Sequence, residues 1–201
     1  MAAGATTLSV LIVTDPCAEA SDDAITISGA LADVGHLVLG VRAGDASLPE
    51  AMARLRPDVV VVKSDSAVRD VLEHIVIATR DARRPIVMFT DDPDRPTMRS
   101  AIGAGVSAYV VKGLKPERVQ AVIDVAVERF AGEQALRNEL DAARSELADR
   151  KAIDRAKRLL MSRKGLSEPE AHRFLQDLAM KKGLKLRDAA ERVIDVESLL
   201  G

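Results

Sequence analysis

Five short apolar runs, rich in valine and isoleucine, recur through the first 130 residues and constrain the fold most strongly. They are separated by segments with helical periodicity, and they lie at residues 8–13, 38–41, 59–62, 86–89 and 108–111. Strands of a parallel sheet are covered on both faces by helices, so they appear in a sequence as continuous apolar runs. The pattern therefore predicts an α/β domain built on a five-stranded parallel sheet.

Two of these runs belong to longer motifs, VLIVTD at residues 10–15 and SAYVVKG at residues 107–113. Together with the spacing of the five runs, they resemble the flavodoxin-like receiver domain of bacterial response regulators. The resemblance covers residues 8–130. We therefore expect a receiver-like domain at residues 1–130.

The resemblance implies a phosphorylation pocket at the carboxyl ends of the strands. Such a pocket needs acids to hold Mg²⁺, an aspartate after the third strand to accept phosphate, a threonine or serine after the fourth and a lysine after the fifth. The metal and the lysine neutralise the charge on the transferred phosphoryl group. The positions that match the pocket are Asp15, Lys63, Thr90, Tyr109 and Lys112.

Lys63 stands at the position of the family's acceptor aspartate, and Thr14 replaces a second acid beside Asp15. Lysine can neither form an acyl phosphate nor help to bind a cation. We therefore expect a pseudo-receiver that is not activated by phosphorylation, in which Lys63 either pairs with Asp15 or is a solvated loop residue. Asp65 is the only nearby substitute acceptor, but it lies beyond the predicted strand end.

A long stretch from residue 116 to residue 161 has helical periodicity, and after its first residue Gly132 is its only glycine or proline. Within it, four apolar side chains follow one another at a spacing of four, three and four residues, namely Leu136, Leu140, Ala143 and Leu147. This spacing is typical of a heptad repeat. We expect a continuous helix whose segment 131–149 pairs with a second copy as a coiled coil and gives a homodimer. A solvated connector helix is the alternative.

The last fifty residues predict three short helices. Gly165 and Gly183 separate three segments with apolar side chains at helical spacing, and glycine readily adopts the backbone angles that end a helix. Ser167 and Glu170 form a capping-box pattern at the start of the second helix. Packing of the three apolar faces predicts a small three-helix bundle at residues 150–201.

Positive charge is concentrated in this C-terminal part. Residues 150–187 carry twelve Lys or Arg against four Asp or Glu, whereas residues 1–149 carry 16 basic and 23 acidic side chains. Segregated positive charge favours a polyanionic partner such as nucleic acid. The alternative is that lysine and arginine simply solvate the helix faces.

Four consecutive segments of the bundle are IDRAKRLLM, GLSEPEAHRFL, LAM and LKLRDAAERVI. Their order and spacing resemble the ANTAR module, a three-helix RNA-binding domain of bacterial transcription antiterminators. Aromatic side chains are few in this segment, so extensive stacking on bases is not expected. We expect recognition of a structured hairpin through its shape, its phosphates and a few base contacts. The side chains expected to contact RNA are Lys157, Arg158, Arg173, Lys181, Lys182 and Lys185.

Two other functions are compatible with the same helices. The segment LAMKKGLKLRDAAERVI also fits a DNA-binding helix-turn-helix, with Ala179, Gly183 and Val193 near the expected small and apolar positions. A protein-interaction adaptor is the second alternative. RNA is favoured over DNA because the ANTAR-like motif includes the preceding helix, which a helix-turn-helix does not require.

The whole chain resembles the NasT-like antiterminators of bacterial nitrate and nitrite assimilation operons. The similar stretches lie at residues 56–76, 83–92 and 101–113, and this family typically carries an aspartate where Lys63 stands. The resemblance implies a regulator that binds paired small hairpins in a leader mRNA and so prevents a terminator from forming. It also implies a nitrate-sensing regulatory protein that holds the regulator inactive in a complex.

No catalytic, metal or cofactor site is predicted, and we expect no enzyme activity. The histidines His36, His74 and His172 are far apart and have no cysteine at metal-binding spacing. Cys17 is the only cysteine, no apolar run is long enough to span a bilayer, and no signal peptide is recognisable. We therefore expect a reduced, soluble, cytoplasmic protein without membrane contact.

Overall fold

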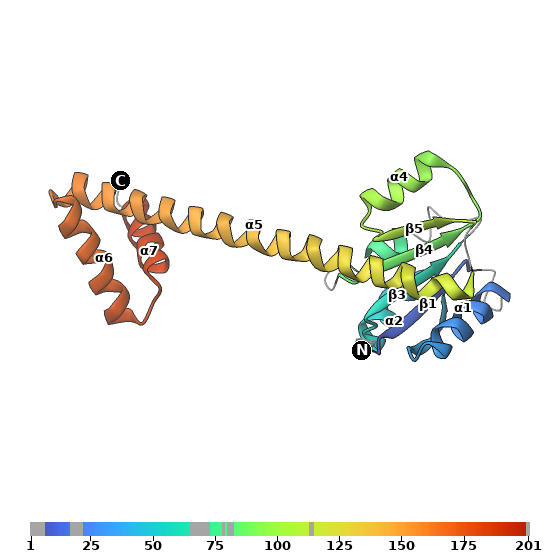
Figure 1. Cartoon of the computed structure of the whole chain (residues 1–201). Helices are drawn as coiled ribbons and strands as arrows, with labels where there is room; N and C mark the ends of the chain where they lie inside the picture. Colours follow the sequence, from blue (N-terminus) through green and yellow to red (C-terminus); the bar gives the residue numbers. More distant parts are fainter. Residues whose placement is uncertain are drawn as a thin grey trace, which may run out of the picture. The chain divides into compact units, whose positions relative to one another are not determined.

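The fold is given by a computed structural model, which describes residues 7–16, 22–64, 73–77, 79, 83–112 and 115–199. The chain divides into two compact units, Met1–Gln134 and Ala135–Gly201. Figure 1 shows helices around a sheet in the first unit and helices alone in the second. Among the described residues, no helix combines the length and the apolar character needed to cross a membrane.

The first unit is built on one sheet of five parallel strands in the order β2-β1-β3-β4-β5. The strands are β1 Ser9–Thr14, β2 Leu37–Ala43, β3 Val59–Lys63, β4 Ile86–Thr90 and β5 Ala108–Val111. Each contains or overlaps one predicted apolar run. The prediction of a flavodoxin-like five-stranded parallel sheet is confirmed.

Side chains along the strands alternate between two core layers, because successive residues of a strand point to opposite faces. Val10 and Ile12 pack under α1 (Asp22–Asp33) and the first turns of α5 (Pro116–Lys164). Leu11 and Val13 pack on the other face, under α2 (Leu48–Leu55) and α4 (Arg95–Gly103). Burial on both faces explains why β3 and β4 are apolar up to their last residue.

The second unit consists of the C-terminal part of α5 with α6 (Glu168–Lys182) and α7 (Leu186–Leu199). Its core joins an alanine and a larger side chain from each helix: Ala156 and Leu160, Ala171 and Leu175, and Ala190 and Val193. Alanine at a helix contact lets the backbones approach closely, so a small core suffices for three short apolar faces. The predicted C-terminal three-helix bundle is confirmed.

The two turns of the bundle follow the predicted capping chemistry. Gly165 and Gly183 have φ of +66° and +62°, in the left-handed region that glycine adopts without strain. The Ser167 backbone N–H and hydroxyl donate to Glu170 Oε2 at 2.8 and 2.6 Å and complete the capping box at the start of α6. These bonds lower the pKa of Glu170.

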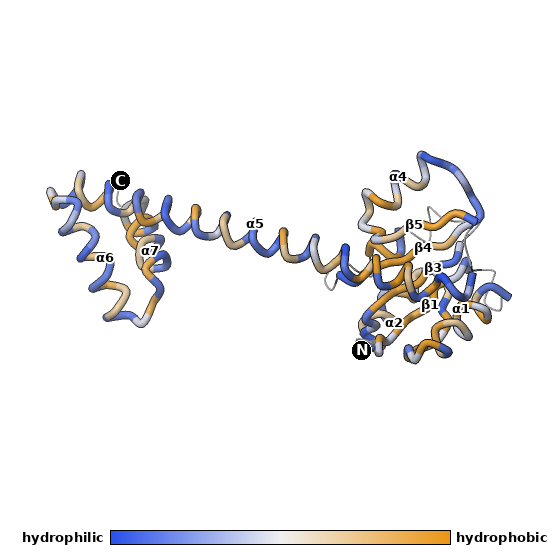
Figure 2. The backbone as a smooth tube through the Cα atoms, viewed as in Figure 1, coloured by the Kyte–Doolittle hydropathy of each residue, from blue (hydrophilic) through white to orange (hydrophobic). Residues whose placement is uncertain are grey.

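Helix α5 is continuous over 49 residues and contributes to both units. Residues 131–149, the predicted linker, are therefore the middle of one helix, and the limits 1–130, 131–149 and 150–201 stay a prediction. Leu136, Leu140 and Leu147 are 68 %, 48 % and 53 % exposed within the chain. Figure 2 shows separate apolar positions along this otherwise hydrophilic stretch. A stripe of exposed leucines at heptad spacing is available for a partner helix.

Candidate functional site

The carboxyl ends of three central strands bring the predicted receiver-pocket residues together. In the β1–β3 register Thr14 lies opposite Lys63, and in the β3–β4 register Lys63 lies opposite Phe89, one residue before Thr90. Thr14, Lys63 and Thr90 are all buried. Parallel pairing therefore places three side chains, far apart in sequence, along one edge of the sheet.

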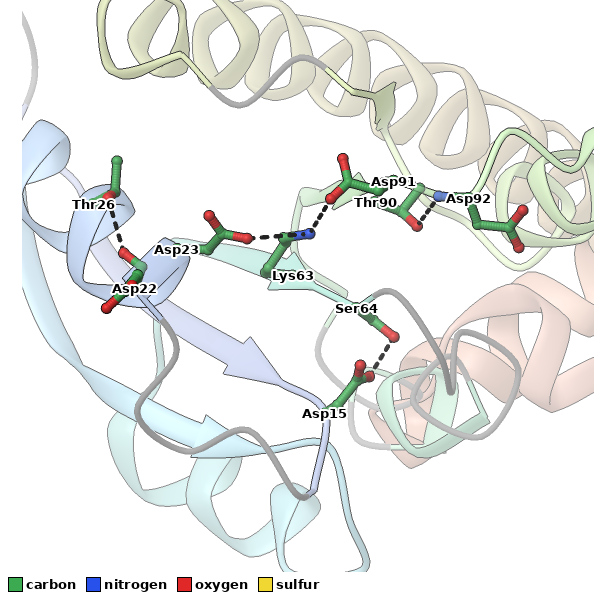
Figure 3. A network of polar contacts seen from close by, with 9 residues as sticks. All are labelled: Asp15, Asp22, Asp23, Thr26, Lys63, Ser64, Thr90, Asp91 and Asp92. Atoms are coloured by element: carbon green, nitrogen blue, oxygen red, sulfur yellow. Dashed lines mark hydrogen bonds and ion pairs between the residues drawn. The ribbon is translucent and has the colours of Figure 1, made fainter.

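Lys63 is the last residue of β3, and its side chain is only 6 % exposed. Its Nζ lies 3.3 Å from Asp23 Oδ2, in the first turn of α1, and 3.3 Å from Asp91 Oδ2, just after β4. Figure 3 shows the ammonium between these two carboxylates. A buried ammonium needs such partners, because desolvation of an unpaired charge is costly. Lys63 is thus a buried strand residue with ion pairs rather than a solvated loop lysine.

Asp15 follows β1 and accepts a hydrogen bond from the Ser64 hydroxyl (Figure 3). From the sequence, Lys63 was expected either to pair with Asp15 or to be solvated, and the roles of Asp23, Asp91 and Ser64 were not foreseen. The sequence did indicate Asp91, since two acidic residues follow Thr90 at the end of the fourth apolar run. Nothing in the sequence indicated Asp23, because its contact with Lys63 depends on how α1 packs against the sheet.

Thr90 connects the remaining pocket residues. Its hydroxyl accepts from the Asp92 backbone N–H at 3.1 Å, and its carbonyl accepts from the Lys112 N–H at 2.9 Å. Lys112 is exposed and has a left-handed φ of +50°. Tyr109 is half-buried, and burial together with the charge of Asp92 raises the pKa of its phenol. The predicted residues therefore lie at one edge of the sheet, whereas Asp65 and Cys17 fall outside the described residues.

This arrangement has clear chemical consequences. The side chain that ends β3 is an ammonium, which cannot accept a phosphoryl group as a carboxylate does. Its positive charge also neutralises the neighbouring carboxylates and opposes a second cation at short distance. The pocket is suited to a fixed internal charge rather than to a metal ion and a phosphoryl group.

In the C-terminal bundle, five of the six predicted RNA-contacting side chains are exposed, namely Arg158, Arg173, Lys181, Lys182 and Lys185. They come from the last turns of α5, from α6 and from the turn that precedes α7. The fixed backbone of the bundle thus presents them to solvent, where they are able to meet phosphate groups.

Lys157 differs from the other five. Its side chain is 17 % exposed, and its Nζ lies 2.9 Å from Asp154 Oδ1 and 2.8 Å from Glu168 Oε1. The bond to Glu168 and then the bond to Asp154 raise the pKa of Lys157. Because Glu168 is the first residue of α6, Lys157 also ties α5 to the start of that helix. A second interhelical pair joins Arg187 of α7 to Asp149 of α5 at 3.0 Å.

Comparison with known proteins gives the family. Residues 141–194 match the ANTAR domain. Over 166 residues the chain is 31 % identical to the transcriptional regulatory protein PdtaR of Mycobacterium tuberculosis, in strains CDC 1551 / Oshkosh and ATCC 25618 / H37Rv, covering 82 % of this chain and 80 % of PdtaR. The domain match begins before the predicted limit at residue 150.

Solved structures support the fold of the first unit. The signal receiver domain of a modulated diguanylate cyclase from Desulfovibrio desulfuricans G20 has a TM-score of 0.50 at 24 % identity, covering 63 % of this chain and 98 % of that domain. NtrX from Brucella abortus has a TM-score of 0.51 at 23 % identity, covering 66 % of this chain and 29 % of NtrX. At these identities the likeness shows the fold alone.

A receiver-like α/β domain followed by an ANTAR domain defines a class of response-regulator proteins. Within that class, the chain belongs to the family of transcriptional regulatory proteins that includes PdtaR.

Proposed function

We propose that this chain is a transcription antitermination regulator that binds hairpins in a leader mRNA through its C-terminal bundle and has no enzyme activity of its own. One observation carries the proposal: the ANTAR match falls on the part of the chain where positive charge is concentrated. Binding a leader transcript places the site of action in the cytoplasm, where that transcript is made.

The exposed cations of the bundle would supply phosphate contacts, which give affinity, and the helix surfaces would read the shape of the hairpin. Arg158, Arg173, Lys181, Lys182 and Lys185 are available for this without rearrangement. Lys157 would have to exchange a carboxylate for a phosphate. We therefore assign Lys157 a weaker share in RNA binding than the other five.

The first unit is proposed to act as a pseudo-receiver, in which Lys63 takes the place of the phospho-acceptor. The burial of Lys63 and its ion pairs with Asp23 and Asp91 support this role. Incubation of the purified chain with acetyl phosphate and Mg²⁺ should give no stable phosphorylation. Stoichiometric labelling at Asp65 would overturn the pseudo-receiver.

The target and the signal rest on the resemblance to NasT-like antiterminators. We propose that the leader belongs to a nitrate or nitrite assimilation operon and that a nitrate-sensing regulatory protein holds the regulator inactive. Control by complex formation suits a receiver that lacks an acceptor. A co-encoded nitrate-binding protein that neither co-purifies with the chain nor inhibits its RNA binding would contradict this part.

We also propose a homodimer through the exposed stripe of Leu136, Leu140, Ala143 and Leu147 in α5. Burial of three half-exposed or exposed leucines against their copies removes apolar surface from water. A dimer would hold two RNA-binding bundles in one particle, as two small hairpins in a leader require.

The proposal is tested by measuring binding of the full chain to a two-hairpin leader RNA and to duplex DNA of equal length across a salt series. Lys181→Glu should weaken RNA binding strongly. It should also make the affinity less dependent on salt, because each phosphate contact that the variant fails to make releases no counterion from the RNA. Glu197→Gln, a charge change outside the predicted RNA-contacting residues, serves as the control.

Two outcomes would point elsewhere. Three positions of α6, α7 and the turn between them fit the pattern expected of a helix-turn-helix, since Ala179 and Val193 are buried and Gly183 is in the left-handed region. Equal or tighter binding to duplex DNA would therefore favour a DNA-binding regulator. Regulation in cells that survives charge reversal at Lys181 and Lys182 would favour a protein-interaction adaptor.

A further inference from the structure

The three helices of the bundle enclose an apolar groove with a cationic rim. The groove has a volume of about 280 Å³. Its apolar walls are Leu160 of α5, Phe174 and Leu178 of α6, and Val193 and Val196 of α7. Leu160 is 1 % exposed and forms the floor, whereas Phe174 is 37 % exposed and reaches the opening.

Each helix also contributes one cation to the same groove, namely Lys164, Lys182 and Arg192. All three are exposed, and every charged residue that lines the groove within the described chain is basic. Helical spacing accounts for this arrangement, since Phe174, Leu178 and Lys182 lie four residues apart on one face of α6, as do Leu160 and Lys164 on α5. An apolar slot surrounded by positive charge favours a ligand that is flat and apolar at its centre and anionic at its edges.

Phe174 provides the stacking surface for such a ligand. Lys164 Nζ lies 4.6 Å from the centroid of its ring, a cation–π contact. Because this contact is weak at an exposed site, an incoming ring can take its place over Phe174 while the ammonium moves to a neighbouring phosphate. Phe174 and Lys164 together can therefore bind an aromatic ring and a neighbouring anion at the same time.

We propose that this groove holds one unstacked base of the RNA loop on Phe174, with Lys164, Lys182 and Arg192 binding the phosphates on either side of that base. The inference rests on the proposed RNA-binding function and adds a base-binding subsite to it. Lys164, Phe174 and Arg192 were not among the RNA contacts that the sequence analysis named.

The test measures binding of the full chain to a hairpin leader RNA and to copies in which each loop nucleotide in turn is abasic. Phe174→Leu keeps an apolar side chain in the groove and removes the ring. It should lower affinity about tenfold, as loss of one stacked base does. Lys164→Gln should lower affinity and reduce the slope of affinity against salt by about one phosphate contact.

Met180→Leu is the matched control, because Met180 is on the same helix, is 74 % exposed and does not line the groove. One abasic position should weaken binding of the wild-type chain about tenfold and leave the Phe174→Leu variant nearly unaffected, which couples that base to the ring. Affinities of Phe174→Leu and Lys164→Gln equal to that of Met180→Leu would overturn the groove alone. Failure of the wild-type chain to bind any hairpin would overturn the proposed function with it.

Discussion

At the scale of single residues, the charge of Lys63 decides what the pocket at the carboxyl ends of the strands can bind. The Lys63 side chain is buried at the end of β3. The side chains of its two partners, Asp23 and Asp91, are 45 % and 64 % exposed. Solvent screens such half-exposed pairs, so they contribute little net stability. The main effect of Lys63 is therefore to fix the charge of the pocket rather than to hold the fold together.

The charge of the pocket can be reversed by Lys63→Asp. The new carboxylate would lie among Asp15, Asp23 and Asp91, and repulsion and burial should destabilise the chain by roughly 2 kcal/mol. Millimolar Mg²⁺ should recover part of that loss, because clustered carboxylate oxygens are the ligands that Mg²⁺ prefers. Thermal unfolding with and without Mg²⁺ measures both effects.

Lys63→Met is the control for this experiment, since it keeps an unbranched side chain of similar length and removes its charge. Its melting temperature should not respond to Mg²⁺, and neither should that of the wild-type chain. A Lys63→Asp variant that is as stable as Lys63→Met and indifferent to Mg²⁺ would show that these acids do not form a receiver-type cluster.

At the scale of elements, the sequence was most informative where local chemistry decides the structure. The apolar run at residues 59–62 predicted β3, and Gly165 and Gly183 marked the turns of the bundle, because these signals depend on neighbouring residues only. The ion pair of Lys63 with Asp23 joins residues forty positions apart. It follows from the packing of α1 on the sheet, which no local pattern encodes.

Substitution of two glycines, Gly132 and Gly183, by alanine should change the free energy of unfolding in opposite directions. Gly132 lies inside α5, is exposed, and has no atom within 4 Å of an added Cβ, so Gly132→Ala should stabilise by roughly 0.5–1 kcal/mol. Gly183 has φ of +62°, so Gly183→Ala should destabilise by roughly 1 kcal/mol. Urea unfolding followed by circular dichroism measures both, and shifts of the same sign would contradict the backbone assignment.

At the scale of the whole molecule, the segregation of charge and the exposed leucines of α5 support one mechanism. Residues 1–149 are acidic overall and residues 150–187 are basic, so a polyanion is attracted to one part of the chain and repelled by the rest. A coiled coil through Leu136, Leu140 and Leu147 would double the basic part in one particle. Two linked sites bind two linked hairpins more tightly than either binds alone, because the second contact becomes intramolecular.

This mechanism predicts a difference between one hairpin and two. The wild-type chain should bind a two-hairpin leader RNA about 100-fold more tightly than a single hairpin. Leu140→Lys brings like charges together at the centre of the predicted coiled coil, so sedimentation should show a monomer and the two affinities should become equal. Ala142→Lys adds the same charge at an exposed position outside the stripe and should retain the difference. If Leu140→Lys kept its preference for two hairpins, the paired sites would have to come from a contact other than α5, because single-hairpin binding by the bundle does not depend on Leu140.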